Sequence, residues 1–415
     1  MLVLGNIKMQ KLEHQISIIY PTDPLGPGIG GIKTFINGFI KYAPENFSIK
    51  FIGISLDNKK RPSKKWTRLS LGYKNFDFFP LFFEKDENKK TLIPLSLRFT
   101  LALEFSKVEI GGKILFFNRI EPAILFRKKV NFSKVAVVHS DTIKQLIKGK
   151  SDIIWNKIPW IYFMLEKYIF NFLDVIYVVN KSTLRFYQSK YQEQKEKFHS
   201  LPTWVDKKIF YPINKSKEKI RQNLITTDSQ LSRSGKWILF VGRLQEEKSP
   251  FLLIKTFAEY HKQDSDSYLL IIGEGNLKQK MKDYARKLGL VQSVYFMGYK
   301  SQVELAEYYR AADVMLLTSN YEGMPRCVLE ALGSGLPVVS TDVGEVKRII
   351  NNGVSGEVVG SVSPSNIFQS IKKVLDNPKI YSKDNCIKAV SDYTPQKVLA
   401  RVYKTIRKLQ IYHKT

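Results

Sequence analysis

The stretch DVMLLTSNYEGMPRCVLEALGSGLPVVST (313–341) has the pattern of a strand, a loop, a helix and a second strand. Its two ends, 313–319 and 336–341, are short apolar runs typical of strands that are buried on both faces of a parallel sheet. Between them, Gly323 leaves the backbone accessible and Pro325 suits the first turn of a helix. The stretch therefore predicts one unit of an α/β fold.

The same alternation of Val/Ile-rich runs with helical stretches continues through the chain and predicts an α/β protein built on parallel sheets. In the first half, the expected strands cover 16–20, 49–55, 113–118, 134–139 and 175–180. In the second half, they cover 237–242, 268–273, 294–298, 313–319 and 336–341.

The length of 415 residues exceeds what a single hydrophobic core usually holds, so two domains are expected. A polar segment without strand signals follows LPTWVDKKIFYP (201–212) and separates the two series of strands. We therefore predict an N-terminal domain over 1–205 and a C-terminal domain over 206–394. A C-terminal helix, about 395–415, is expected to rejoin the first domain.

The chain is strongly basic, with 66 Lys and Arg against 38 Asp and Glu and a formal charge of +28. Such a surface favours polyanions or anionic lipid, but the charge is spread over both halves and does not define a site. The cysteines, Cys327 and Cys386, cannot build a disulfide framework or a four-ligand zinc site. They indicate a reducing compartment, which predicts a cytoplasmic protein.

The N-terminus has too short an apolar run for a signal peptide. The most membrane-like run, 153–173, is interrupted by Lys157, Glu166 and Lys167. These charges predict an amphipathic helix rather than a membrane span.

In open parallel sheets, ligands bind at the carboxyl ends of the strands, so residues that follow a strand are the best candidates for a site. Glu322 follows the strand in the quoted stretch, and Glu330 lies in the helix, so both carboxylates could bind hydroxyl groups of one ligand. The amides at the helix N-terminus, near Met324, Arg326 and Cys327, predict an anion site. An alternative interpretation makes Glu330 an exposed acid on the helix surface.

A second cluster follows strand 237–242. Arg243 lies at the end of that strand, and Lys248 lies just ahead of a helix that Ser249 can cap. An arginine and a lysine beside a helix N-terminus suit a diphosphate. The alternative is a solvated pair on a basic surface.

In the first half, Gly26, Gly28 and Gly31 have the spacing of a dinucleotide-binding loop, and Asp57 follows the second strand. Several residues, including two prolines, separate the first strand from these glycines, which weakens the match. This loop keeps a nicotinamide oxidoreductase open as a minor alternative. The net charge alone suggests a nucleic-acid-binding protein, and we expect no nucleic-acid partner.

His139 ends strand 134–139 at the edge where a ligand would bind, and its alternative is a surface histidine. The other histidines lack metal-ligand spacing. The DSD stretch at 264–266 precedes a strand and so lies at the wrong edge for a metal site. We therefore predict no metal site.

The blocks in the second half resemble the retaining glycosyltransferase family 4, including its two glutamates separated by seven residues. The matching blocks are VGRLQEEKSP (241–250), IIGEGNLKQKM (271–281), VYFMGY (294–299), the region 311–346 and NNGVSGEVV (351–359). In the first half the resemblance covers only GGIKTF (30–35), His139 and 201–212.

This resemblance implies the GT-B architecture, in which two Rossmann-like domains face each other across a cleft. It makes 1–205 the acceptor-binding domain and 206–394 the domain that binds the nucleotide-sugar donor. It implies that Arg243 and Lys248 hold the donor diphosphate, Glu330 bonds the ribose and Glu322 bonds the transferred sugar. It assigns further donor contacts to the backbone of Gly323, Met324, Arg326 and Cys327, and to Gly30 and Gly31 of the other domain. It also implies that His139 reaches the sugar, so Glu322 and His139 are the expected catalytic residues.

Five positions depart from the family pattern. Thr203 stands where asparagine is frequent, Ser249 replaces glycine, and Glu345 replaces the second glycine of a pair. Arg348 stands where an acid is common, and Arg326 stands where an aliphatic residue is usual.

The implied reaction is transfer of a sugar from a UDP- or GDP-linked donor to a glycan or lipid-linked acceptor, in polysaccharide biosynthesis. The resemblance implies retention of the anomeric configuration, front-face attack and no metal cofactor. A GT-B-shaped nucleotide-sugar epimerase is the closest alternative. The basic charge suits the inner face of an anionic membrane. The aromatic run 75–83, near Lys64, Lys65 and Arg68, is either a membrane contact or, as we favour, part of the core.

Overall fold

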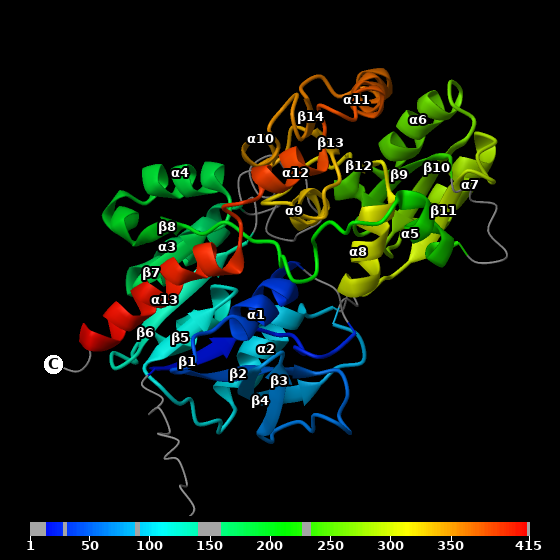
Figure 1. The fold of residues 1–415 in the computed structure, drawn as a ribbon. Helices are drawn as coiled ribbons and strands as arrows, with labels where there is room; N and C mark the ends of the chain where they lie inside the picture. Colours follow the sequence, from blue (N-terminus) through cyan, green and yellow to red (C-terminus); the bar gives the residue numbers. More distant parts are fainter. Residues whose placement is uncertain (1–13, 28–30, 88–91, 140–158, 226–233, 413–415) are drawn as a thin grey trace, which may run out of the picture. The chain divides into compact units, whose positions relative to one another are not determined.

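The computed structural model describes residues 14–27, 31–87, 92–139, 159–225 and 234–412. The chain forms two compact units. The first comprises Met1–His139, Lys157–Leu201 and Pro395–Thr415, and the second comprises Ser140–Asn156 and Pro202–Thr394. Each unit has its own sheet, so the predicted α/β class is confirmed (Figure 1).

The first unit contains an eight-stranded sheet in the order β3-β4-β2-β1-β5-β6-β7-β8. Its strands are β1 (His14–Ile19), β2 (Phe47–Ser55), β3 (Thr67–Leu71), β4 (Lys74–Phe83), β5 (Ile114–Phe117), β6 (Ser133–Val138), β7 (Val175–Val178) and β8 (Phe198–Ser200). Its helices are α1 (Gly31–Lys41), α2 (Leu95–Glu104), α3 (Pro159–Phe172), α4 (Lys181–Lys190) and α13 (Pro395–Tyr412), with short 3-10 turns η1 (Glu121–Phe126) and η4 (Gln192–Lys197). The C-terminal helix α13 packs beside α1, where Tyr403 stacks on Phe39 and donates to its carbonyl.

The aromatic run 75–83 belongs to strand β4, which is paired with β2 and forms an antiparallel hairpin with β3. Phe76 and Phe78 are fully buried, and Leu81 is nearly so. The core interpretation is therefore confirmed for the centre of this run, whereas Phe83 at its end is 43% exposed. The expectation of a purely parallel sheet is wrong at this edge, because Gly72 adopts a left-handed φ of 59° and turns β3 back into β4.

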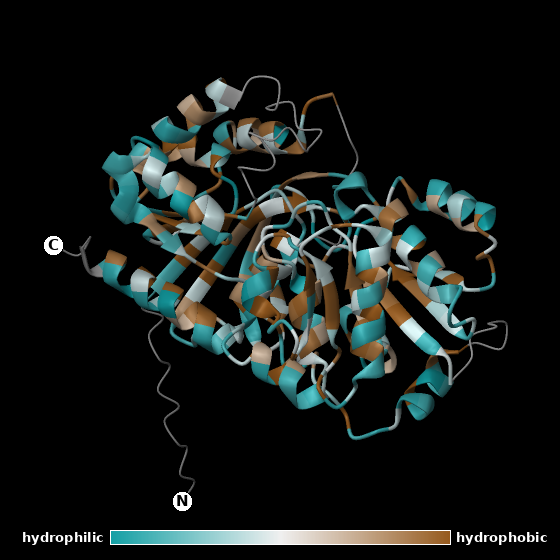
Figure 2. Cartoon of the chain, turned by 90° about the horizontal axis from the view of Figure 1, so that it is seen from above, coloured by the Kyte–Doolittle hydropathy of each residue, from teal (hydrophilic) through white to brown (hydrophobic). Residues whose placement is uncertain are grey.

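The second unit contains a six-stranded parallel sheet in the order β11-β10-β9-β12-β13-β14. Its strands are β9 (Lys236–Val241), β10 (Ser267–Ile272), β11 (Val294–Gly298), β12 (Val314–Leu317), β13 (Val338–Thr341) and β14 (Gly356–Val359). Its helices are α5 (Lys217–Leu224), α6 (Pro250–His261), α7 (Lys278–Lys287), α8 (Gln302–Ala311), α9 (Arg326–Gly333), α10 (Val346–Ile349), α11 (Pro364–Asp376) and α12 (Lys383–Ala389), and a 3-10 turn, η5, covers Glu246–Lys248. Figure 2 shows hydrophobic strands covered by helices with polar outer faces.

A buried charge network fixes the start of the central strands of this second sheet. Asp313 accepts from Lys217 at 2.8 Å, from Arg221 at 2.7 Å and from the backbone amide of Trp237 at 2.8 Å. Asp313 precedes β12 and Trp237 lies in β9, so the network joins the two strands whose opposite ends carry the predicted site. The positive neighbours hold the pKa of Asp313 below its usual value, although burial opposes this shift.

The first unit also contains a buried carboxylate, Glu166 on α3. It accepts hydrogen bonds from Tyr187 at 2.6 Å and from Tyr191 at 2.9 Å. Burial raises the pKa of Glu166 from 4.5 to about 7, although the tyrosine hydroxyls oppose the shift. Of the predicted amphipathic run 153–173, the structure describes Pro159–Phe172, which forms helix α3. Lys157 lies outside the described residues.

The raised pKa of Glu166 predicts a stability that depends on pH. The folded protein retains a proton that the unfolded chain releases between pH 4.5 and about 7, so this group lowers the free energy of unfolding as pH rises through that window. Glu166→Gln removes the titration and keeps the shape. We compare the free energy of unfolding of the variant with that of wild type at each pH. The difference should favour the variant by about 1–3 kcal/mol more at pH 8 than at pH 5. Denaturant unfolding at both values, with exposed Glu193→Gln as control, measures this, and an equal effect of Glu166→Gln at the two values would contradict it.

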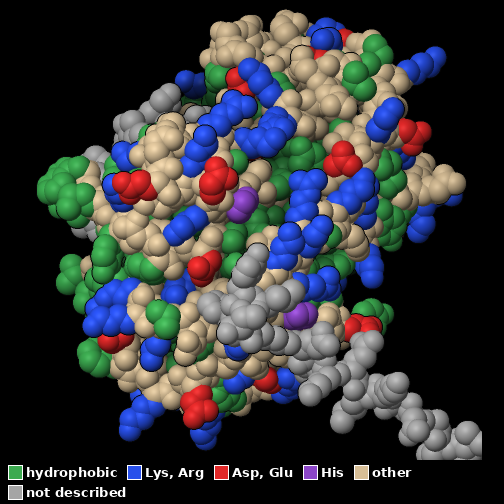
Figure 3. All heavy atoms as spheres, turned by 90° about the vertical axis from the view of Figure 1, so that its left-hand side faces the viewer, with side chains coloured by type: hydrophobic (Ala, Val, Ile, Leu, Met, Phe, Trp, Pro, Cys, Tyr) green, Lys and Arg blue, Asp and Glu red, His purple; other side chains and the backbone are tan. Residues whose placement is uncertain are grey.

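Lys and Arg side chains predominate over Asp and Glu on the face shown in Figure 3, as the composition predicts. Among the described residues, no helix is both long enough and apolar enough to cross a membrane.

Candidate functional site

The candidate site lies at the carboxyl edge of the second sheet. Strands β9, β12 and β13 are neighbours and run parallel, so the loops that follow them meet at one edge. The two loops that carry the predicted basic and acidic residues are therefore brought together, although about seventy residues separate them in sequence.

An ion pair between Lys248 and Glu322 joins these two loops, and each side chain is only 14% exposed. Ser319 donates to the same carboxylate oxygen of Glu322 at 2.8 Å. Burial alone would lower the pKa of Lys248, but the charge and hydrogen bond of Glu322 outweigh it and raise that pKa. Lys248 is therefore a fixed cation near the sheet edge.

Backbone contacts hold this pair in place. Thr318 donates to the carbonyl of Lys248 at 2.9 Å, and the amide of Asn320 donates to the carbonyl of Glu247 at 2.8 Å. Ser249 adopts a left-handed φ of 47°, which explains why glycine would suit this position. The prediction that Ser249 caps helix α6 is wrong for its side chain, which makes no capping hydrogen bond.

The loop after β13 supports the same residues from a third side. Gly344 has a φ of 54°, and a Cβ atom built there would lie 2.4 Å from the carbonyl oxygen of Gly323 and 2.7 Å from that of Glu322. Thr341 donates to the carbonyl of Ser319 at 2.7 Å. The absence of a side chain at Gly344 therefore allows the Glu322–Gly323 backbone to pack closely.

Glu330 on helix α9 is only 7% exposed, so its interpretation as a helix-surface acid is wrong. Tyr309 donates to one of its carboxylate oxygens at 3.2 Å, and Arg326 lies 3.7 Å from the other. Burial raises the pKa of Glu330, and both neighbours oppose this shift. Arg326 and Tyr309 thus orient Glu330 and favour its ionised form.

Two departures from the family pattern contact each other. The guanidinium of Arg326 donates to the hydroxyl of Thr203 at 3.1 Å, and the amide of Thr203 contacts the sulfur of Met324 at 3.2 Å. A second pair of departures, Glu345 and Arg348, forms an ion pair at 3.5 Å. Four of the five departures therefore contact another departure within the second unit, and Ser249 is the exception.

Comparison with known proteins identifies this region. Residues 223–392 match the family described as glycosyl transferases, group 1. The match lies within the second unit and shows that this segment is similar to that family. Over 61% of the chain and 63% of the relative, the sequence is 26% identical to an uncharacterised glycosyltransferase of Methanocaldococcus jannaschii. The chain thus spans less than two thirds of the length of this relative.

Solved structures share the fold of the whole chain. Sucrose-phosphate synthase from Thermosynechococcus elongatus is 19% identical, with a TM-score of 0.77 over 96% of this chain and 100% of that one. Anabaena HepE, solved in complex with UDP and glucose, is 14% identical, with a TM-score of 0.69 over 95% of this chain and 100% of that one. The predicted GT-B fold is confirmed.

Within the second unit, Arg243 is the most exposed of the predicted site residues, with 61% of its side chain accessible and an ion pair to Glu247 at 3.2 Å. The backbone next to Arg243 is closely packed. A Cβ atom built at Gly273 would lie 1.9 Å from the carbonyl oxygen of Gly242, the residue before the arginine. The exposed guanidinium of Arg243 can therefore be reached by a ligand, and its planar fork suits a phosphate group.

Burial raises the pKa of the Cys327 thiol to about 12, so it is a neutral group and not a nucleophile. Among residues whose placement is described, no group of three or more His, Cys, Asp and Glu has the arrangement of a metal site. The DSD stretch 264–266 lies in the turn before β10, at the opposite edge from Lys248.

In the first unit, His139 directly follows β6 and its Nε2 lies 2.9 Å from the side-chain oxygen of Asn118, which follows β5. The ring packs edge-on against Phe35 at 4.8 Å. Gly31 is the first residue of α1 and has open space beside it, whereas Gly30 lies outside the described residues.

The sequence predictions did not include Asn118, Tyr309, Ser319 or Gly344. The side-chain nitrogen of Asn118 is buried and has no hydrogen-bond partner among the described residues, so its donor capacity is unsatisfied. Asn118 and Ser319 each follow a strand at the carboxyl edge, a signal that applies to them as it does to His139. No comparable signal exists for Tyr309, which lies inside helix α8.

Proposed function

We propose that the chain is a retaining glycosyltransferase that moves a sugar from a nucleotide-diphosphate donor to a glycan or lipid-linked acceptor. The observation that carries this proposal is the buried Lys248–Glu322 pair beside the N-terminus of helix α9. Solved relatives of the same fold bind UDP or UDP-glucose, which supports a nucleotide-sugar donor and favours UDP as the first nucleotide to test.

In this proposal, Lys248 and the side chain of Arg243 bind the diphosphate, together with backbone amides at the start of α9. Glu330 accepts from the ribose hydroxyls, and Glu322 accepts from the transferred sugar. The remaining donor contacts are the backbone of Gly323, Met324, Arg326 and Cys327 in the second unit, and Gly30, Gly31 and His139 in the first.

The reaction breaks the bond between the anomeric carbon and the diphosphate oxygen, and negative charge develops on the departing nucleotide. Lys248 and the helix N-terminus are arranged to stabilise that charge, so no metal ion is required in the proposal. Glu322 is engaged by Lys248 and Ser319, which makes it a poor nucleophile. We therefore favour attack by the acceptor hydroxyl from the face of the leaving group, with its proton passing to a diphosphate oxygen.

A donor panel tests the proposal. The full chain is incubated with UDP-, GDP- and ADP-sugars, with and without lipid-linked acceptors, and nucleoside diphosphate release and the anomeric proton coupling of the product are measured. We expect one donor to be consumed and its α- or β-configuration to be kept in the product. Release of free sugar without transfer to any acceptor would favour an epimerase-type or hydrolytic enzyme, and binding of NAD alone would favour an oxidoreductase.

The arrangement around Glu330 predicts a pH dependence of donor binding. Arg326→Met removes a positive neighbour, so the pKa of Glu330 should rise further and leave it protonated over a wider pH range. We expect the variant to bind its nucleoside diphosphate more weakly than wild type at pH 6, with much of the loss recovered at pH 8.5. Thr203→Val, which loses the hydrogen bond but keeps the charge, is the control. A loss that is independent of pH would contradict this role of Arg326.

We also propose a cytoplasmic location with peripheral binding to anionic membrane, supported by the formal charge of +28. Co-sedimentation with vesicles should increase with their content of anionic lipid. Binding that is absent, or that ignores the lipid charge, would contradict this part of the proposal.

A further inference from the structure

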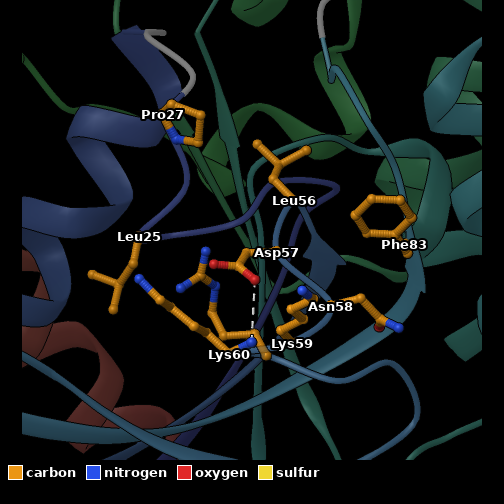
Figure 4. A pocket seen from close by; sticks show the side chains of 9 residues that line it. Leu25, Pro27, Leu56, Asp57, Asn58, Lys59, Lys60 and Phe83 are labelled. Atoms are coloured by element: carbon orange, nitrogen blue, oxygen red, sulfur yellow. Dashed lines mark hydrogen bonds between the residues drawn. The ribbon is translucent and has the colours of Figure 1, made fainter.

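The first unit contains a hollow of about 710 Å³ that none of the predicted donor contacts occupies. Its lining comes from the loops after β1 and β2 and from the end of β4: Leu25, Pro27, Leu56, Asp57, Asn58, Lys59, Lys60, Arg61 and Phe83 (Figure 4). Strands β4, β2 and β1 are neighbours and run parallel. The hollow therefore lies at the carboxyl edge of the first sheet, where ligands of open α/β sheets bind.

A buried carboxylate, Asp23, holds the wall of this hollow in place. Its side chain is fully buried, and it accepts from Arg61 Nε at 2.8 Å and from the amides of Leu56 at 2.8 Å and Leu25 at 3.1 Å. All three donors line the hollow. Asp23 therefore fixes the loop after β1 to the loop after β2, and the hollow is pre-formed.

The loop after β4 is tied to the same structure. Glu87 accepts from the hydroxyl of Thr22 at 2.6 Å and lies 3.9 Å from Lys33, while Lys33 donates to the carbonyl of Gly26 at 2.6 Å. A Cβ atom at Gly26 would lie 2.7 Å from Leu56. Three loops are thus locked by ionic contacts that the proposed transfer reaction does not use.

Only some of the charged side chains in the lining have a partner within the protein. Arg61 is paired with Asp23, and the carboxylate of Asp57 accepts from the amide of Lys60 at 3.2 Å within its own turn. Lys59 and Lys60 are exposed, and neither has an ion-pair partner among the described residues. Leu25 and Phe83 are exposed by 41% and 43%, and with Pro27 and Leu56 they give the hollow an apolar wall.

We propose that this hollow binds the phosphate and the adjoining apolar group of the acceptor, so that the acceptor is a sugar joined through phosphate to a hydrocarbon chain. This inference rests on the proposed function. Lys59 and Lys60 would bind the phosphate, and Leu25, Leu56 and Phe83 would contact the chain.

The distance of the hollow from His139 determines which kinetic constant should change when binding in the hollow is lost. Strand β2 lies three strands from β6, which His139 follows, so the hollow is roughly 14 Å from that histidine at the usual strand spacing. A group bound so far from the reacting hydroxyl contributes equally to the ground state and the transition state. Loss of the lysines should therefore raise the KM for the acceptor and leave kcat unchanged.

Binding of decyl phosphate, below its micelle concentration, tests the inference without knowledge of the acceptor sugar. The full chain, Lys59→Gln/Lys60→Gln and Phe83→Ala are titrated with decyl phosphate, decanol and inorganic phosphate. Lys128→Gln/Lys129→Gln, an exposed pair outside the lining, has the same charge change and is the control. We expect the Lys59/Lys60 variant to weaken binding of decyl phosphate at least tenfold, Phe83→Ala to weaken it about threefold, and the control to leave it within twofold.

Three results would overturn the inference: no binding of decyl phosphate to wild type, an equal loss in the control, or equally tight binding of inorganic phosphate. The last result would indicate a small phosphorylated acceptor without a chain. Nucleoside diphosphate binding is measured on the same samples. If it is present while decyl phosphate fails to bind, only the acceptor inference fails, and if it is absent, the proposed function itself fails.

Discussion

Lys248→Ala is expected to lower kcat/KM for the nucleotide-sugar donor by about 10²–10³-fold, the usual effect of removing one pre-positioned group that stabilises developing charge. Lys248 is a largely buried cation, and the charge of Glu322 raises its pKa, so Lys248 remains protonated near neutral pH. Most of the effect should fall on kcat, because charge on the diphosphate increases as the glycosidic bond breaks.

The matched control is Lys255→Ala, an exposed lysine in the neighbouring helix α6. Its turnover should remain within twofold of wild type. Thermal unfolding of both variants separates loss of chemistry from loss of structure, since the alanine at 248 also leaves the carboxylate of Glu322 without its partner. Near-normal turnover of a folded Lys248→Ala protein would remove Lys248 from the site.

Gly344→Ala is expected to weaken donor binding by tenfold or more and to destabilise the protein by about 1–3 kcal/mol. The added Cβ atom would lie 2.4 Å from the carbonyl oxygen of Gly323, and the residue has a φ of 54°. The backbone that carries Glu322 must therefore shift, which displaces the predicted sugar contact. Donor affinity and urea unfolding measure the two effects.

Gly353→Ala provides an informative comparison. Gly353 also has a left-handed φ, 78°, but a Cβ atom there meets nothing within 4 Å. This variant should therefore have the backbone strain without the displacement, and lose stability while keeping its donor affinity. Equal losses of donor affinity in both variants would contradict the role assigned to Gly344.

The fold and the ligand edge of the second unit could be predicted because parallel strands give strong local patterns. The apolar runs at 237–242 and 313–319 correspond to β9 and β12, and the loops after them meet because the two strands are neighbours. The β3–β4 hairpin escaped prediction because β3 is mostly polar and Pro80 interrupts the pattern of β4. Pattern reasoning identifies buried parallel strands better than edge strands that are half solvated.

The surroundings of Glu330 could not be predicted, because they depend on contacts between distant segments. Arg326 and Thr203 are 123 positions apart in sequence, and nothing local in either segment indicates the other. Seen separately, each was only a departure from the family pattern. Their contact suggests that a change at one position is compensated at the other.

The most direct test of the central claim, that the loops after β9 and β12 hold a nucleoside diphosphate, is a calorimetric comparison of UDP with uridine, or of GDP with guanosine if the donor panel selects GDP. Wild type should bind the diphosphate far more tightly than the nucleoside, and Lys248→Ala should reduce that difference at least tenfold while leaving nucleoside affinity unchanged. An affinity difference of the same size in the variant would contradict the claim.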